Sequence, residues 1–595
     1  MSKAKQPKKK EEETTTKKST PKKSNIPLVK YLWGVVVAIL VFAMYFNSIN
    51  HDYTLDDIGA INENRYVLEG FSGIPKLMKI EFWHFQNTHL SYYRPLSLIT
   101  FAIENEFTKN NPQLGHFINV LIFAFSTFLL FLVLSKLFRN THALFAFAAT
   151  VLYAAHPLHT EVVANIKGRD ELLSFLNIMA MIWFTLKFID TKKISSLIAS
   201  LIFCYLGMLS KETALTGVLL LPVVIFYYTD LSILECLKKT ALPFAVVLIF
   251  FMQKKLFLGT LSGVIPVDIV NYPYTQFAVK IPTTFFLFAF CLKLLIFPHP
   301  LRYEYSYNQI PAVGFTDIWA ILGILLFFTG LYFTYKQAMK KTVWGFALAV
   351  FYITLVPSLA FTILRGGIFA ERFLFAPSLG FCIALVYGIA LLTKTDFSIN
   401  KNNLITTLKS NLKLVGPVLV IMILYGFKTI TRNTAWKDDY TLFSTDIKTG
   451  ENSAQNQRHL AKKIIDKAAL EKDSTKKAAL ANEAVNVLKQ ALKIHPKFGE
   501  AYYLTGYVYQ IITPNLDTAI YYYQKAIQTA PSFYIPYFNV GIIYQMRGDN
   551  EMASFHYNEA VRYNPEFQEA RNAADNLRKL GIDVRTNPML NRAPK

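Results

Sequence analysis

Five polar clusters stand beside apolar segments of this 595-residue sequence, and they carry residue types that can do chemistry. Ionisable side chains near membrane-spanning segments are costly to place and tend to be functional. Carboxylates suit base chemistry, whereas arginine and lysine bind anions. The clusters are NHDYTLDDIGAINENRYV with Asp56 and Asp57, YYRPLS with Arg94 followed by NPQLGHFIN with His116, AAHPLHTEVVANIKGRDE with His156, His159, Glu161, Lys167, Arg169, Asp170 and Glu171, LSKETA with Lys211 and Glu212, and RGGIFAERFLFAPS with Arg365, Glu371 and Arg372. If all five face one side of a membrane, acids and cations meet in a single cavity.

The histidines of the third cluster raise the question of a metal site. HPLHTE brings His156, His159 and Glu161 close together in sequence, but it lacks the HExxH spacing that places two histidines on one helical face. We therefore predict no metal site here and a structural or hydrogen-bonding role for the histidines.

Other charged residues in the clusters have two interpretations. As an isolated pair, Asp56 and Asp57 fit a solvated turn. Because they follow the first apolar run closely, base chemistry fits them equally well. Arg169 and Arg372 fit snorkelling or helix capping as well as anion binding. No G-x-x-x-x-G-K-[ST] motif occurs in the sequence, which excludes ATP-driven transport by such a phosphate loop within this chain.

The composition places these clusters in a membrane protein. Only 17% of the residues are charged, against about 25% in soluble domains, and 53% are hydrophobic. Yet 62 Lys and Arg oppose 40 Asp and Glu, for a net charge of +22.

Residues 1–30 hold ten Lys and three Glu and are typical of a disordered tail. The apolar run 28–46 is too long for a signal peptide, so we expect an uncleaved first membrane helix that leaves the tail in the cytoplasm.

Apolar segments of near-spanning length recur as far as residue 430. With the first helix they give twelve candidates, the others being 117–135, 142–163, 171–189, 194–209, 213–229, 240–258, 282–298, 316–335, 343–362, 372–392 and 412–430. In membrane proteins the basic loops lie on the cytoplasmic side. If every candidate segment crossed the membrane, the last two basic loops would lie on the outer side. We therefore predict about eleven crossings, with 282–298 re-entrant or parallel to the surface because it is short and contains Lys293. The residues after 431 then lie outside.

The section 453–581 is polar and repeats itself. Pro496, Pro531 and Pro565 recur at spacings of 35 and 34 residues. Positions that keep this step include Gly506 and Gly541, Tyr509 and Tyr544, Ala519 and Ala553, and Ala491 with Ala526 and Ala560. Small residues where two helices touch, and proline at the closing turn, are what a 34-residue helical hairpin requires. We predict about three tetratricopeptide repeats, which stack into a superhelix with a concave groove.

The sequence thus predicts an all-α chain, a polytopic membrane helix bundle followed by an α-solenoid. The expected parts are a Lys-rich cytoplasmic tail at 1–27, a membrane domain at 28–430 with its first outer loop at 48–113, a connector at 431–452, the repeats at 453–581 and a tail at 582–595.

Several motifs in order resemble a known family. YTLDD, YYRPLS, LGHFIN, LYAAHPLHTEVVANIKGRDELL, SKET, PLRYEYSYNQIP, AERFLFAPSLGF and TAWKDDYTLFSTDI, ending in the repeats, are similar to the transmembrane and tetratricopeptide-repeat O-mannosyltransferases and their bacterial relatives. These are polytopic glycosyltransferases of the GT-C type, and the similarity covers about residues 48–581. It implies transfer of a sugar such as mannose from a polyprenyl-phosphate or dolichyl-phosphate donor to protein Ser or Thr hydroxyls on the periplasmic or luminal face.

The resemblance also implies roles for residues. Asp56 and Asp57 correspond to the acidic motif of the first outer loop, and we predict that Asp56 is the general base. Five cations would bind the donor phosphate, in descending order Arg372, Arg169, Arg94, Lys211 and Lys167. The residues expected to orient them are His116, His159, Glu161 and Glu371. We expect no metal and no other cofactor, since arginine can hold one lipid monophosphate.

Two other classes of protein remain in view. A non-enzymatic, membrane-anchored scaffold would use the repeats to assemble complexes on the outer side. A lipid or ion transporter would carry charges at mid-membrane depth, where this sequence places only Lys254, Lys255, Lys293 and Lys428. We expect a bacterial inner membrane, or an endoplasmic reticulum membrane, with the acceptor polypeptide held by the repeats and no role for nucleic acid.

Overall fold

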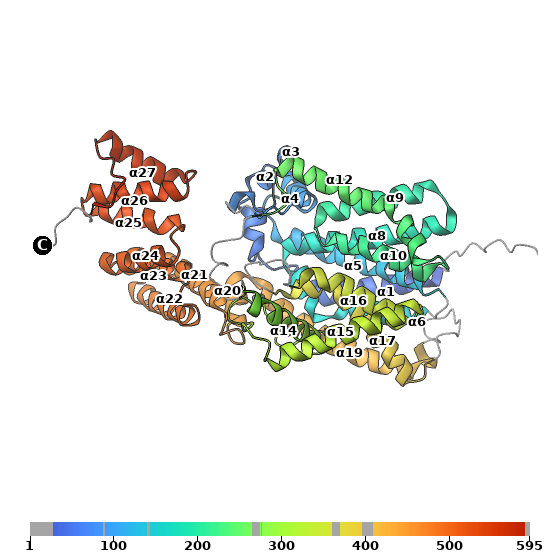
Figure 1. The fold of residues 1–595 in the computed structure, drawn as a ribbon. Coiled ribbons are helices and arrows are strands. Elements are labelled where there is room, and N and C mark those ends of the chain that lie inside the picture. The colour runs from blue at the N-terminus through green and yellow to red at the C-terminus, as the bar shows by residue number, and fades with distance from the viewer. Residues whose placement is uncertain are drawn as a thin grey trace, which may run out of the picture.

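The computed structural model describes residues 28–86, 90–139, 143–263, 274, 276–359, 369–395 and 408–588 (Figure 1). The tail 1–27, Arg365 and residues 589–595 lie outside these ranges. Within them every regular element is a helix, which confirms the predicted all-α class. A bundle of long, roughly parallel helices forms one part, and a smaller stack of helices extends from one end of it.

Apolar helices make up the bundle. Among the described residues, seven are long and apolar enough to cross a membrane, and five shorter apolar helices pack with them. The long ones correspond to α1 (Leu28–Tyr45), α5 (Pro112–Leu137), α8 (Arg169–Thr191), α12 (Ala241–Leu258), α14 (Phe277–Ile296), α15 (Ile318–Met339) and α19 (Leu412–Asn433). The shorter ones are α6 (Ala143–Ala155), α9 (Ile194–Ser210), α10 (Ala214–Tyr228), α16 (Val343–Leu355) and α17 (Pro377–Leu392). A short helix, α11 (Ile233–Lys239), begins with a capping box at Ser232 between α10 and α12.

The segment after α1 folds onto one end of the bundle. It contains the short helices α2 (Arg65–Leu68) and α3 (Ile74–Leu77), followed by α4 (Pro95–Thr108). Its own small core includes Trp83 and Phe101 and extends to Ile166, just before α8. The first polar cluster is therefore fixed against the third by apolar packing.

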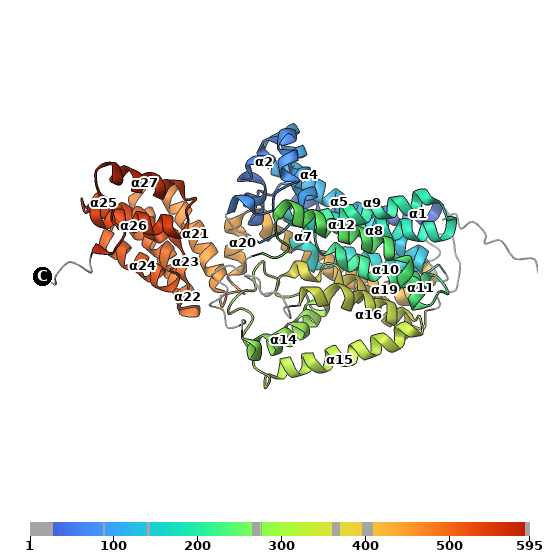
Figure 2. The ribbon, with the colours of Figure 1, turned by 45° about the horizontal axis from the view of Figure 1, so that its top comes forward.

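Helix α14 covers the segment that we predict not to cross. It is one continuous helix of spanning length, yet it lies beside the half of α15 nearer the repeats (Figure 2). Near its start, Thr283 Oγ1 accepts from the backbone N–H of Val313, in the loop before α15. At its end, the carbonyl of Leu295 accepts from the hydroxyl of Tyr425 at 3.1 Å. By length and composition α14 is also one of the seven candidate spans, so the non-crossing placement of 282–298 and the count of eleven crossings stay predictions.

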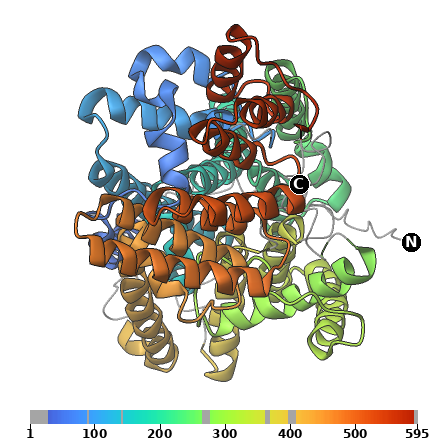
Figure 3. The same cartoon turned by 90° about the vertical axis from the view of Figure 1, so that its left-hand side faces the viewer.

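The C-terminal helices form antiparallel pairs, as a solenoid requires. They are α20 (Asp439–Asp446), α21 (Ala454–Leu470), α22 (Ser474–Ile494), α23 (Gly499–Tyr507), α24 (Leu516–Thr529), α25 (Tyr534–Met546), α26 (Asn550–Tyr563) and α27 (Gln568–Lys579). Figure 3 looks onto this stack, in front of the bundle. A Cβ on Gly506 would lie 2.7 Å from the ring of Tyr523, and one on Gly541 would lie 2.6 Å from Tyr557. The predicted repeat period therefore reflects equivalent close helix crossings.

The repeats are continuous with the bundle. One apolar core contains Ile464 of α21, Trp436 after α19, and Tyr303 from the loop between α14 and α15. Next to it, the guanidinium of Arg432 pairs with Asp446, and Nη2 lies 2.8 Å from Oδ2. Because both side chains are almost fully buried, this pair fixes the exit of α19 against α20.

Close contact between α14 and α15 leads to a first prediction. A Cβ on Gly323 would collide with the carbonyl oxygen of Phe285, a backbone atom that cannot move aside, whereas a Cβ on Gly416 of α19 would meet nothing within 4 Å. We expect Gly323→Ala to lower the stability by about 1–3 kcal/mol, seen as a lower Tm in detergent. Gly416→Ala, the matched control, should leave the Tm unchanged or raise it slightly. An equal Tm for the two variants would contradict the close packing.

Candidate functional site

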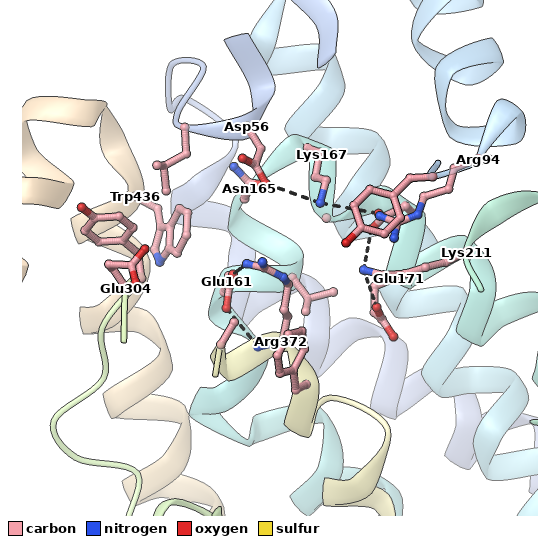
Figure 4. Close-up of a pocket in the computed structure, with 18 of the residues that line it drawn as sticks. Asp56, Arg94, Glu161, Asn165, Lys167, Glu171, Lys211, Glu304, Arg372 and Trp436 are labelled. Atoms are coloured by element: carbon pink, nitrogen blue, oxygen red, sulfur yellow. Dashed lines mark hydrogen bonds and ion pairs between the residues drawn. The ribbon is translucent and has the colours of Figure 1, made fainter. Parts of the chain in front are cut away.

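A cavity of about 280 Å³ lies where the bundle meets the repeats (Figure 4). All parts of the chain that carry polar clusters contribute to its wall. Its charged and larger polar lining residues are Asp56, Tyr92, Arg94, Glu161, Asn165, Lys167, Asp170, Glu171, Lys211, Tyr303, Glu304, Arg372, Trp436 and His459. The structure thus brings together Asp56, Glu161 and four of the five predicted cations.

Asp170 is the centre of the ionic network. It lies in the first turn of α8, and its side chain is fully buried. Its carboxylate lies 2.8 Å from Nη1 of Arg94, 3.2 Å from Nζ of Lys211 and 3.6 Å from Nζ of Lys167. Because the cations come from three segments, this one carboxylate fixes the mutual positions of three walls.

Glutamates complete the pairing of these cations. Glu212 lies 2.9 Å from Nε of Arg94, and Glu171 lies 2.7 Å from Nζ of Lys211. The side chains of Arg94 and Lys211 are only 9% exposed. Charge-assisted hydrogen bonds of this kind hold side chains in fixed orientations, so these two cations are rigid parts of the wall.

Asp56 and Arg372 have the most exposed side chains among the ion-paired residues that line the cavity. Their side chains are 43% and 34% exposed. Glu161 holds Arg372 twice, because it accepts from the backbone N–H at 2.9 Å and pairs with the guanidinium. Asp56 lies 3.4 Å from Nζ of Lys167, a long contact, so its carboxylate is only loosely held.

Asp57, predicted beside Asp56 as catalytic, points the other way. Its carboxylate is fully buried and accepts from the backbone N–H groups of Thr54 at 3.0 Å and Lys167 at 2.6 Å. Burial raises its pKa to about 7, although these donors oppose the shift. Asp57 therefore ties the first cluster to the third, and a positioning role replaces the predicted catalytic one.

Arg169, predicted to bind the donor phosphate, does not line the cavity, and neither does His116, predicted to orient the cations. Arg169 is fully buried, pairs with Glu104 and donates to the carbonyl of Gly115 at 2.9 Å. His116 Nε2 lies 3.3 Å from the carbonyl oxygen of Asp52. The reason is helix geometry: Arg169 and Asp170 are neighbours at the start of α8, and adjacent helical residues point about 100° apart.

The side chains of His159 and Glu371 contact other residues than the predicted cations. His159 Nε2 lies 2.9 Å from Oγ of Ser378, which fits the structural role predicted for the histidines. Glu371 accepts from the hydroxyl of Tyr305 at 2.6 Å and from the backbone N–H of Arg302. It therefore holds the loop that presents Tyr303 and Glu304 rather than orienting Arg372. Of the four predicted orienting residues, only Glu161 contacts a cavity cation.

The prediction missed part of the wall. Trp436 and Glu304 face the cavity in Figure 4, and His459 of α21 brings the first repeat to the site. The indole Nε1 of Trp436 is buried and has no hydrogen-bond partner among the described residues. Trp436 lies in the motif TAWKDDYT, which was a usable signal, whereas nothing in the local sequence singles out His459. Among the described residues, no group of three or more His, Cys, Asp or Glu side chains could hold a metal ion.

Comparisons with known proteins agree with this architecture. The model of the dolichyl-phosphate-mannose-protein mannosyltransferase family matches residues 98–256. Protein O-mannosyl-transferase TMTC3 of Homo sapiens is 28% identical over 471 residues, which cover 72% of this chain and 48% of that protein. The chain is similar to the TMTC protein O-mannosyl-transferases. TMTC1 of Homo sapiens is 26% identical, with 77% and 54% covered, and F38B6.6 of Caenorhabditis elegans is 24% identical, with 74% and 61% covered.

The chain spans about half the length of the curated relatives it matches. Two solved structures match smaller parts of it. The crystal structure of MamA is 20% identical, with a TM-score of 0.20, and covers 24% of this chain and 76% of its own. TTC0263, a thermophilic TPR protein of Thermus thermophilus, is 14% identical, with a TM-score of 0.22, and covers 33% and 96%.

Glu371 gives a prediction about pH. Burial raises the pKa of its carboxyl to about 8, against 4.5 in the unfolded chain. The protonated carboxyl gives its full contribution to stability below pH 4.5, the pKa in the unfolded chain. This contribution falls as the pH rises above that value and is lost once the pH passes about 8. We expect the wild type to lose on the order of 2 kcal/mol between pH 6.5 and 8 through this group. In Glu371→Gln the amide oxygen still accepts both bonds, so the dependence of Tm on pH should become flatter.

The control for this experiment is Glu63→Gln, which removes an exposed carboxyl from the first outer segment. Its Tm should follow the wild-type curve at every pH. Parallel curves for the wild type and Glu371→Gln would contradict a protonated Glu371.

Proposed function

We propose that this chain is a membrane glycosyltransferase that moves a sugar such as mannose from a polyprenyl-phosphate donor to a protein Ser or Thr hydroxyl. One observation carries the proposal. Asp56 and Arg372 both line the cavity, and their side chains are more exposed than those of the other ion-paired residues of its wall. A carboxylate can take the proton of an attacking hydroxyl, and a guanidinium can hold a leaving phosphate.

The reaction balances on these two groups. The acceptor hydroxyl oxygen forms a bond to the anomeric carbon while the bond from that carbon to the lipid phosphate oxygen breaks. The phosphate leaves with the electron pair, and its added charge meets Arg372. The hydroxyl proton moves to Asp56. Attack from the face opposite the phosphate inverts the configuration at the anomeric carbon.

Lys167 links the anion to the base. It lies between Asp56 and Asp170, at 3.4 and 3.6 Å. A donor phosphate in the cavity attracts the Lys167 ammonium. As this ammonium moves toward the phosphate, its ion pair with the carboxylate of Asp56 becomes weaker. Donor binding thus frees the base. Arg94 and Lys211 are paired with Glu212 and Glu171 as well as with Asp170, so they form a fixed, charge-balanced wall behind Lys167.

The repeats supply the acceptor in this proposal. His459 of α21 and Trp436 line the cavity directly, so a polypeptide held by the array is close to Asp56. The cavity and the repeats then lie on the periplasmic or luminal side of the membrane, the bacterial inner membrane being our first choice. No metal or further cofactor enters the scheme.

Substitution of the two cavity residues tests the chemistry. We expect Asp56→Asn to lower sugar transfer about 10²–10⁴-fold, and Arg372→Gln about 10²–10³-fold, in reconstituted membranes supplied with polyprenyl-phosphate mannose and a Ser/Thr peptide. Asp52→Asn is the matched control, since Asp52 is exposed in the same segment and does not line the cavity. Its activity should equal that of the wild type. Unaltered glycosylation in both cavity variants, at normal abundance, would favour the non-enzymatic scaffold instead.

Cysteine labelling tests the side on which the repeats lie. The four native cysteines are buried, so an introduced thiol gives the signal. Ser532 is exposed between α24 and α25, and Lys340 is exposed after α15, at the opposite end of the bundle. We expect Ser532→Cys to react with an impermeant maleimide in intact cells. Lys340→Cys should react only after permeabilisation, and the reverse pattern would overturn the orientation.

A further inference from the structure

Two lysines inside apolar segments, Lys293 and Lys428, do not reach the cavity. They meet instead around His299, in the loop after α14. The ammonium of Lys293 donates to the carbonyl oxygen of His299, and Nζ of Lys428 lies 3.2 Å from Nδ1 of that histidine. The guanidinium of Arg302 adds a third positive charge close enough to affect His299. We name Lys293, His299, Arg302 and Lys428 the basic cluster.

The basic cluster has a surplus of positive charge. Burial lowers the pKa of His299, and the neighbouring cations lower it further, so the imidazole is neutral and Nδ1 can accept from Lys428. The nearest carboxyls do not balance the lysines. Asp446 is already held by Arg432 in a buried pair, and Glu371, with its pKa near 8, is mostly protonated at neutral pH. Among the described charged groups that act on Lys428, Asp446 thus offers the one ionised carboxylate, and it is already held by Arg432.

Apolar side chains surround the cluster. Leu424 lies one turn before Lys428 on the same face of α19 and is 62% exposed, Phe427 is 70% exposed, and Phe297 beside His299 is 60% exposed. A helix of a membrane bundle exposes such side chains to acyl chains, and lysine near a helix end extends its ammonium to the head-group level. The cluster therefore lies where lipid phosphates are concentrated.

The last turn of α14 is fixed next to α19 at this point. The hydroxyl of Tyr425 donates to the carbonyl of Leu295 at 3.1 Å, and a ring nitrogen of His156 lies 3.1 Å from the same oxygen. The two helices that carry Lys293 and Lys428 are thus held together independently of the lysines. Like charges brought this close repel each other, and an anion between them would remove that cost.

We propose that the basic cluster binds the phosphate head group of an anionic phospholipid in the leaflet on the cavity side. The two ammonium groups donate to phosphate oxygens, and the acyl chains cover Leu424, Phe427 and Phe297. A soluble phosphate ion would satisfy the charges but would leave this apolar surface uncovered. The site is separate from the cavity and does not depend on the proposed reaction.

Lipid binding to the full chain tests the proposal. In native mass spectrometry from detergent, we expect phosphatidylglycerol to bind roughly tenfold more tightly than phosphatidylcholine. Lys293→Gln/Lys428→Gln keeps a polar, hydrogen-bonding side chain that is one atom shorter, removes both charges and should abolish most of this preference. Its Tm in phosphatidylcholine should equal or exceed that of the wild type, since repulsion is lost. The control Lys255→Gln/Lys280→Gln removes the same charge from two other lysines of α12 and α14 and should keep the preference.

The opposite results would each overturn the site. Equal affinity for the two lipids in the wild type excludes head-group recognition of charge. A preference that survives in the Lys293/Lys428 variant places the lipid elsewhere. If inorganic phosphate at millimolar concentration raises the Tm as much as phosphatidylglycerol does and displaces that lipid, the cluster is a soluble-anion site and the lipid assignment fails.

Discussion

The buried carboxylate of Asp170 is shared by three cations from three distant parts of the chain, and the geometry of the cavity depends on it. A buried charge is tolerated only when it is paired, and removal of a partner typically costs about 3–5 kcal/mol. The network therefore holds Arg94, Lys167 and Lys211 in place whether or not an anion is bound. Asp56 and Arg372 lie at its edge, where their side chains stay partly exposed.

A second buried pair extends the same constraint to the repeats. Arg432 and Asp446 fix the end of α19 against α20, and the backbone N–H of Tyr303 donates to Asp446 at 2.7 Å. The loop after α14 is thereby attached to the start of the repeats. Trp436 and His459 complete the wall from this side. The solenoid is consequently part of the site rather than a separate module joined by a linker.

Sequence reasoning identified the right segments more reliably than the right residues. Asp56, Glu161 and Arg372 face the cavity as expected, but Asp57 and Arg169 do not. Each of these two is adjacent to a residue that does line the wall. Neighbouring residues in a turn or helix point in different directions, so a cluster of charges tells which segment is polar without telling which side chain points inward. His459 could not be found at all, because its role comes from the docking of α21.

The sequence by itself determined the all-α class, the membrane bundle and the repeats, since each rests on a local pattern: apolar runs of spanning length, loop charge, and a 34-residue period. It also identified five segments that contribute to the cavity wall. Only the tertiary structure decided that Asp170 is the shared counter-ion, that Asp57 is a backbone acceptor, and that Lys293 and Lys428 meet at His299. These outcomes depend on distances between residues up to about 135 positions apart, and no local pattern encodes such contacts.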